Sequence, residues 1–157
     1  MAGSYSMTPC VHDDSDSRQT TLRHDAAIRE PMILIVENDW RTSRFIRTIL
    51  KYETNALVME ASCPRAALLM AKALDRPIDL LIVEVELAHA KSGLDLAREI
   101  AAITPSIKVL LMSFRDGPPC NTPPAWRFLS IPFRTETFLS CVSQLCDSKP
   151  SCPCISG

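Results

Sequence analysis

The strongest constraint on this chain is a regular alternation between short apolar runs and amphipathic segments. Runs rich in β-branched and aliphatic residues predict buried strands: MILIV (32–36), ALVME (56–60), DLLIVEV (79–85), IKVLLM (107–112) and WRFLS (126–130). Segments with helical periodicity separate most of them, which is typical of βαβ crossovers that build a parallel sheet with helices on both faces. The sequence therefore predicts an α/β fold.

The segments between these runs carry helix signals. The helix expected after Asp39 has Phe45, Ile46, Ile49 and Leu50 on one face. In the next helix Ser62 is a candidate N-cap, and Ala66, Leu69, Met70 and Ala73 are expected to form the buried stripe. Ser92 and Thr135 are expected to begin two further helices. Residues 114–125 contain four prolines and a glycine, which exclude a helix of any length there.

Composition divides the 157 residues into one domain with a segment on either side. Residues 1–30 are polar, with Asp/Ser clusters and no apolar periodicity, so they predict a disordered leader. Residues 31–146 form the expected domain, and 147–157 a disordered tail. Cys146, Cys152 and Cys154 crowd this tail, but without a C-x-x-C or a companion histidine a solvated tail is favoured over a metal site.

Charge and hydropathy exclude several classes of partner. A formal net charge of −1 gives no global attraction to nucleic acid or to an anionic membrane. No apolar stretch approaches the ~20 residues of a membrane span. The N-terminus also lacks the basic start and apolar middle of a signal peptide. We therefore expect a cytoplasmic protein with no nucleic-acid or membrane partner.

The candidate site lies where the predicted strands end. Open α/β sheets bind ligands at the carboxyl ends of their strands. Glu37 and Asn38 follow the first strand, and Glu84 lies at the end of the third. Ser113 follows the fourth strand and Ile131 the fifth.

Those positions resemble the receiver domain of two-component response regulators. The matching stretches are ILIVEND, DLLIVEVELAHAKSGLDLAREI, VLLMS and FLSIPF, and the resemblance covers residues 31–146. It implies a flavodoxin-like three-layer αβα sandwich whose five-stranded parallel sheet has the order 2-1-3-4-5. The Pro-rich stretch stands where the family has its fourth helix, so we expect that helix to be shortened or absent.

The resemblance also implies a role for each site position. In receivers two acids after the first strand hold Mg²⁺, an aspartate accepts the phosphoryl group, a hydroxyl binds its oxygens and a lysine neutralises its charge. Glu37 matches the first acid, Asn38 stands in place of the second, and Ser113 fits the hydroxyl. Glu84 replaces the aspartate, which moves the carboxylate by ~1.5 Å, and Ile131 replaces the lysine.

Phe128 occupies the position of the family's aromatic switch residue, and we expect it to be a half-buried strand residue. For Glu84 three interpretations compete. It mimics a phosphorylated aspartate, it helps Glu37 bind a divalent cation, or it is a leftover carboxylate at a solvated strand end. The last interpretation is favoured and mimicry is the least favoured, because the lysine that would pair with a phosphate-mimicking carboxylate is absent.

Together these departures predict a pseudo-receiver: a stand-alone protein-interaction module in phosphorelay signalling, not an enzyme, with no cofactor and a weakened affinity for Mg²⁺. Its expected partner is a histidine kinase, a phosphotransfer protein or a downstream effector. The resemblance implies that the first helix, with Trp40, Arg41 and Arg44, could meet a kinase-side or phosphotransfer partner, although a solvated helix surface is favoured for the two arginines. The alternative is a residual phosphoacceptor that uses Glu84 with a cation held by Glu37 and Glu84. A flavodoxin-like nucleotide or flavin binder is disfavoured because no Gly-rich loop follows the first strand. A decaying paralogue, the partner's identity and the oligomeric state stay open.

Overall fold

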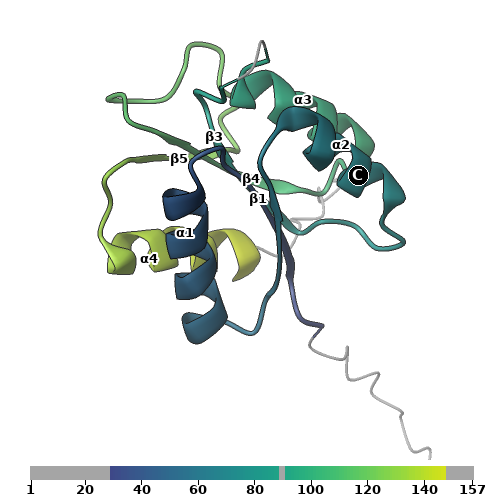
Figure 1. Ribbon diagram of the computed structural model, residues 1–157, viewed down its shortest axis with the longest axis horizontal. Helices are drawn as coiled ribbons and strands as arrows, with labels where there is room; N and C mark the ends of the chain where they lie inside the picture. Colours follow the sequence, from purple (N-terminus) through teal and green to yellow (C-terminus); the bar gives the residue numbers. More distant parts are fainter. Residues whose placement is uncertain (1–28, 89–90, 148–157) are drawn as a thin grey trace, which may run out of the picture.

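In the computed structural model, which describes residues 29–88 and 91–147, five strands form one parallel sheet. They are β1 (Met32–Val36), β2 (Leu57–Ala61), β3 (Leu80–Glu84), β4 (Lys108–Ser113) and β5 (Arg127–Ser130). Their order is β2-β1-β3-β4-β5, as the resemblance implied (Figure 1). The predicted leader and tail lie almost entirely outside the described residues.

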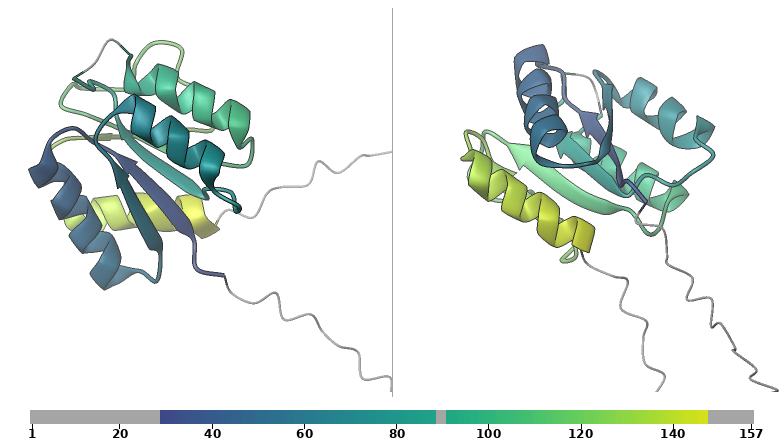
Figure 2. Two further views of the ribbon diagram at one scale, coloured as in Figure 1. Left: turned by 45° about the vertical axis from the view of Figure 1, so that its right-hand side comes forward. Right: turned by 90° about the horizontal axis from the view of Figure 1, so that it is seen from below.

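Four helices cover the two faces of the sheet: α1 (Trp40–Glu53), α2 (Pro64–Ala73), α3 (Gly93–Ile103) and α4 (Thr135–Asp147). Helices α1 and α4 lie on one face, and α2 and α3 on the other (Figure 2). The predicted three-layer flavodoxin-like architecture is therefore confirmed. Among the residues described, every helix is too short or too polar to cross a membrane.

Strand periodicity explains why the central strands are apolar throughout. In β1, Ile33 and Ile35 pack toward α1 and α4, whereas Leu34 and Val36 pack toward α2 and α3. All five residues of β1 are buried, because helices cover both faces. The edge strands β2 and β5 carry exposed positions. The candidate site thus lies at the end of the most buried part of the fold.

The connection between β4 and β5 contains no helix, as its prolines predict. Two of its residues have positive φ, Gly117 at 86° and Asn121 at 65°, and these let the chain turn without regular structure. The fold is therefore a receiver-type sheet in which an irregular loop replaces one helix.

Two details of the helices differ from the prediction. The N-cap of α2 is Cys63, not Ser62, and its side chain makes no capping hydrogen bond. Leu69 is 60% exposed, because α2 buries Pro64 and Ala67 instead of the predicted stripe. Residues 66–71 (AALLMA) are all apolar, so their periodicity does not define a face. On α1, Phe45 is likewise 49% exposed.

Both ends of the described chain lie at the edge of the sheet where the strands begin, the amino edge. Arg29 and Pro31 line the same groove as Cys146 and Asp147. At this edge the Asp79 carboxylate accepts a hydrogen bond of 2.8 Å from the backbone N–H of Met32 and pairs with Arg29 and Arg76. These contacts fix the start of β1 on the side opposite the carboxyl edge, where the strands end.

Candidate functional site

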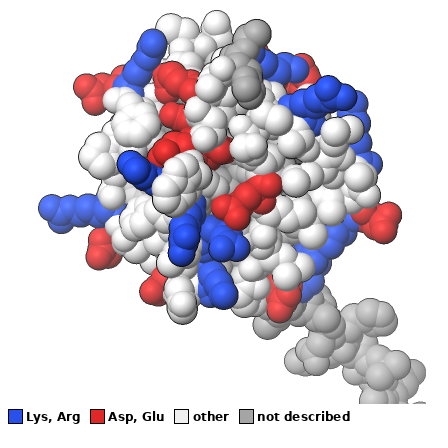
Figure 3. Space-filling view, in the orientation of Figure 1, with Lys and Arg blue, Asp and Glu red and all other residues white. Residues whose placement is uncertain are grey.

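The structure brings the predicted site residues together at the carboxyl edge of the sheet. Glu37 directly follows β1, Glu84 ends β3, and Ser113 ends β4. Ile131 follows β5, and its backbone N–H donates to the carbonyl of Ser113 over 2.7 Å. Acidic side chains gather on this side of the molecule, near the start of α1 (Figure 3).

Glu37 is buried, and its two carboxylate oxygens have different surroundings. Oε1 accepts a hydrogen bond of 2.9 Å from the backbone N–H of Asp39. Oε2 is buried and has no hydrogen-bond partner among the described residues. Burying a carboxylate oxygen without a hydrogen-bond donor costs free energy. Oε2 is therefore an acceptor of this site whose hydrogen-bonding capacity is not used by the described residues.

Glu84 lies beside Glu37 and is only 5% exposed, so the expectation that it stands at a solvated strand end is wrong. Burial, followed by the neighbouring carboxyl of Glu37, raises the pKa of Glu84 to about 8. Glu86 and Asp39 raise it further through their charges. Two carboxyls this close do not both ionise readily. The pair therefore keeps a proton at neutral pH.

The two residues that follow Glu37 have surroundings different from those of the acid pair. Asn38 is exposed to solvent. Asp39 is the N-cap of α1, and its carboxylate accepts hydrogen bonds from the backbone N–H and the hydroxyl of Thr42 at 3.1 and 2.8 Å. These bonds lower the pKa of Asp39 below its usual range. Asp39 therefore serves the helix terminus, as helix-capping preferences predict.

Ser113 is buried, and its Oγ accepts a hydrogen bond of 2.9 Å from the backbone N–H of Arg115. The guanidinium of Arg115 in turn pairs with Glu86 at 3.2 Å. No ion pair in the described part of the chain involves Glu37 or Glu84. The acid pair thus has no cationic side chain bound to it.

Ile131 is half-buried and packs against the apolar cluster under α1 and α4. It precedes Pro132 through a cis peptide bond. The ring of Phe133 stacks on Phe138, with centroids 5.1 Å apart, and lies 6.1 Å from the ring of Phe45. Ile131 is therefore part of an apolar and aromatic surface.

Phe128 is half-buried, as expected, and packs against the cluster under α2 and α3.

A divalent cation finds few ligands at this edge. Among the described residues no group of three or more His, Cys, Asp or Glu side chains is placed to hold a metal ion. Burial and the neighbouring carboxyl of Glu37 raise the pKa of Glu84 to about 8, so Glu84 keeps its proton at neutral pH. Mg²⁺ prefers carboxylate oxygens in octahedral geometry and would have to displace that proton.

Gly93 sets how closely α3 approaches the site. Its backbone N–H donates to the carbonyl of Val85 over 2.9 Å. A Cβ atom at this position would lie 1.8 Å from the carbonyl oxygen of Glu84. Ser92 caps the helix by accepting from the N–H of Asp95 at 3.2 Å, as predicted. The Ser-Gly pair therefore positions the backbone of Glu84 as well as starting the helix.

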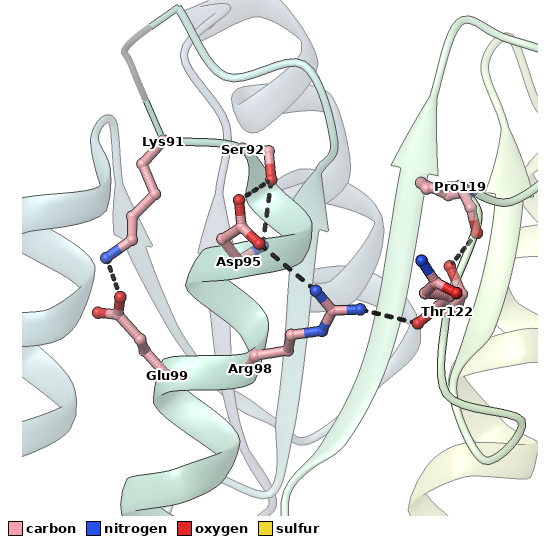
Figure 4. Close-up of polar contacts among 8 residues, drawn as sticks. Lys91, Ser92, Asp95, Arg98, Glu99, Pro119 and Thr122 are labelled. Atoms are coloured by element: carbon pink, nitrogen blue, oxygen red, sulfur yellow. Dashed lines mark hydrogen bonds and ion pairs between the residues drawn. The ribbon is translucent and has the colours of Figure 1, made fainter.

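Arg98 connects this helix to the Pro-rich loop, a contact that the sequence did not reveal. Its guanidinium donates to the carbonyl of Asn121 over 2.8 Å and approaches Asp95 at 3.5 Å (Figure 4). Within the loop, Thr122 donates to the carbonyl of Pro119 over 2.8 Å. The loop that replaces a helix is thus tied to α3 by one side chain.

Replacing Arg98 with alanine is expected to raise amide hydrogen exchange several-fold around Asn121 and Thr122, because the tether to α3 is lost. The cost in stability should be about 1 kcal/mol, as for one partly exposed charged hydrogen bond. Arg44→Ala is the matched control, since it removes an exposed arginine from α1. Unchanged loop exchange in Arg98→Ala would show that the loop holds its shape without the tether.

Comparison with known proteins gives one family match and many structural matches. The family described as response regulator receiver domain matches residues 33–123. No curated protein matches the chain. The signal receiver domain of an HD domain-containing protein from Pseudomonas fluorescens Pf-5 is 22% identical, with a TM-score of 0.66, over 74% of this chain and 94% of that one.

Two further solved structures are similar to the same extent. A response regulator receiver protein from Sinorhizobium medicae WSM419 is 21% identical, with a TM-score of 0.67, over 78% of this chain and 98% of that one. The receiver domain of the hybrid histidine kinase CckA is 23% identical, with a TM-score of 0.63, over 73% and 98%. Identities this low establish the fold alone. The chemistry of the site has to be inferred from the residues of this chain.

Proposed function

Because the chain belongs to the response regulator receiver domain family, we propose that it is a pseudo-receiver, a protein-interaction module of two-component signalling whose binding does not depend on phosphorylation. The observation that carries the proposal is Ile131. It occupies the position of the family's lysine and packs into the apolar cluster under α1 and α4.

Phosphoryl transfer depends on positioning and on charge stabilisation. An aliphatic side chain at 131 supplies no positive charge to a phosphorylated carboxylate. No described ion pair reaches Glu84, and Asn38 adds no second negative charge for Mg²⁺. Glu84 places its carboxylate about 1.5 Å further from the backbone than an aspartate would. Each departure weakens a different part of the reaction, so their combination supports an inactive phosphoacceptor.

On this proposal the chain is not an enzyme and needs no Mg²⁺ to act. Its activity lies in binding a signalling partner, such as a histidine kinase, a phosphotransfer protein or an effector. The first helix offers a surface for this: Trp40 is 65% exposed, and the guanidinium of Arg41 lies 5.5 Å from its ring centroid. Exposed aromatic and arginine side chains are enriched where proteins bind one another.

The test is the mass of the intact chain after incubation with Mg²⁺ and acetyl phosphate. The native chain is expected to gain no phosphate. A restored variant, Glu84→Asp/Asn38→Asp/Ile131→Lys, is expected to gain one, because the fold that positions these residues is retained. Adding Mg²⁺ without the donor is the control for adducts of the ion.

The alternative function, a residual phosphoacceptor, has one specific observation in its favour, the unpartnered Oε2 of Glu37 beside Glu84. Under that alternative the native chain gains one phosphate, and Glu84→Gln abolishes the gain. Such a result would overturn the pseudo-receiver and make Glu84 a working nucleophile.

A further inference from the structure

Helices α2 and α3 are bordered by two hollows on the side away from α1 and α4. The hollow beside the first turns of α2, which we call the upper hollow, has a volume of about 390 Å³. It is lined by Pro64, Arg65, Leu68, Leu69, Lys72 and Lys91. The lower hollow, of about 470 Å³, lies between the ends of α2 and α3 and includes Lys72, Asp75, Arg76 and Ile103. Lys72 lines both hollows, and we name the two together the α2–α3 groove.

The upper hollow combines an apolar floor with a basic rim, whereas Asp75 adds a negative charge to the lower hollow. Leu69, 60% exposed, lies among the prolyl and leucyl side chains of the upper hollow. Arg65 and Lys72 have no ion-pair partner in the described part of the chain, whereas Lys91 pairs with Glu99. Lys and Arg side chains are visible over the helices α2 and α3 (Figure 3). A ligand for this surface should therefore carry negative charge next to apolar side chains.

The lower end of the groove lies beside the point where the described chain begins. The guanidinium of Arg76 donates to the carbonyl of Glu30 over 2.5 Å, so residue 30 is fixed next to the lower hollow. The Nε of the same arginine is buried and has no hydrogen-bond partner in the described residues. A buried donor of this kind normally has an acceptor.

The composition of that preceding segment matches the groove. Residues 12–17 read HDDSDS, with Asp13, Asp14 and Asp16 close together, and Met7 and Val11 come just before them. Twelve residues lie between Asp16 and Arg29, and the thirteen steps along the chain can span up to about 43 Å. The ten residues of α2 are about 15 Å long. The acids can therefore reach Lys72 and Arg65 without strain.

We propose that the α2–α3 groove is the docking surface for this chain's own acidic leader, residues 7–16. The acids pair with Arg65 and Lys72, and the apolar residues before them cover Leu69. Residues 148–157 suit this surface less well, because they carry Lys149 and neither Asp nor Glu. Tethering raises the effective concentration of the leader to the millimolar range, so weak contacts suffice. A partner for the α2–α3 face must then displace the leader.

The test is the ¹H–¹⁵N NMR spectrum of the full chain. Asp13→Asn/Asp14→Asn/Asp16→Asn is expected to shift the amide signals of Arg65, Leu69 and Lys72, and high salt should move the native signals in the same direction. Arg65→Glu/Lys72→Glu should shift the amide signals of the leader. The further change Asp13→Lys/Asp14→Lys/Asp16→Lys reverses the charges on both sides, and it should move the signals of the unchanged leader residues back toward their native positions. The matched control, Arg41→Glu/Arg44→Glu on α1, should leave the leader signals unchanged.

Three outcomes would overturn the proposal. If the amide signals of the groove residues do not shift in the asparagine variant, the acids do not dock there. Leader signals that respond equally to the α1 control indicate nonspecific attraction to positive charge. Shifts that grow with protein concentration indicate that a second copy, not the chain's own leader, occupies the groove.

Discussion

Replacing Gly93 with alanine is expected to lower the free energy of unfolding by about 3 kcal/mol or more. The added Cβ would lie 1.8 Å from the Glu84 carbonyl oxygen and 2.8 Å from its carbonyl carbon. These are backbone atoms of a buried strand, so the clash is relieved only if α3 or β3 moves. Alanine favours a helix over glycine by about 1 kcal/mol, and the steric cost must exceed that gain.

Thermal or urea unfolding followed by circular dichroism measures this effect. A loss of 3 kcal/mol should lower Tm by about 10 °C in a domain of this size. Gly117→Ala is the control, because it adds the same methyl group where no atom lies within 4 Å. Its φ of 86° makes that change cost only about 1 kcal/mol. If Gly93→Ala lowered the free energy of unfolding no more than Gly117→Ala does, α3 would not approach Glu84 as closely as the structure shows.

Replacing Glu84 with glutamine is expected to stabilise the protein at pH 8 by about 2 to 3 kcal/mol, and to change little at pH 5. The folded state raises the pKa of Glu84 from its ordinary value of 4.5 to about 8. A raised pKa means that the folded state binds this proton more tightly than the unfolded state. The stabilisation from the proton is therefore complete below pH 4.5 and is lost as the pH rises through 8. Glutamine keeps the shape without the charge.

Denaturant unfolding from pH 5 to pH 9, with a chelator present, measures this difference. The native stability should fall across the range, while that of Glu84→Gln should fall less. Glu53→Gln removes an exposed carboxylate from the end of α1 and should follow the native curve. Parallel curves for the native chain and Glu84→Gln would show that Glu84 ionises normally in the folded state.

The sequence was sufficient for the architecture, because each element has a strong local signal. The uninterrupted apolar residues of β1 and β3 indicated strands buried on both faces, and the prolines of 118–124 excluded the missing helix. The position of the site followed as well, since parallel strands end at the same edge. Glu37, Glu84 and Ser113 lie there because strand ends place them there.

Contacts between distant elements were beyond the reach of local patterns. Arg98 and Asn121 are 23 residues apart, and nothing in their spacing links them. The exposure of Leu69 depended on which side of the all-apolar stretch 66–71 met the sheet. The raised pKa of Glu84 needs the distance between two strand ends and the water excluded from them. These features depend on packing, which a periodicity does not specify.

The position of the chain ends at the amino edge has a practical consequence for binding measurements. Arg29 and Asp147 lie at the edge where the strands begin, and Glu84 lies at the other, about 17 Å away along five residues of β3. A sensor surface coupled after α4 would therefore hold every molecule with its acidic edge and the start of α1 facing the solution. Partners that need this edge should bind such a surface fully, whereas random coupling through lysines should block a part of the molecules.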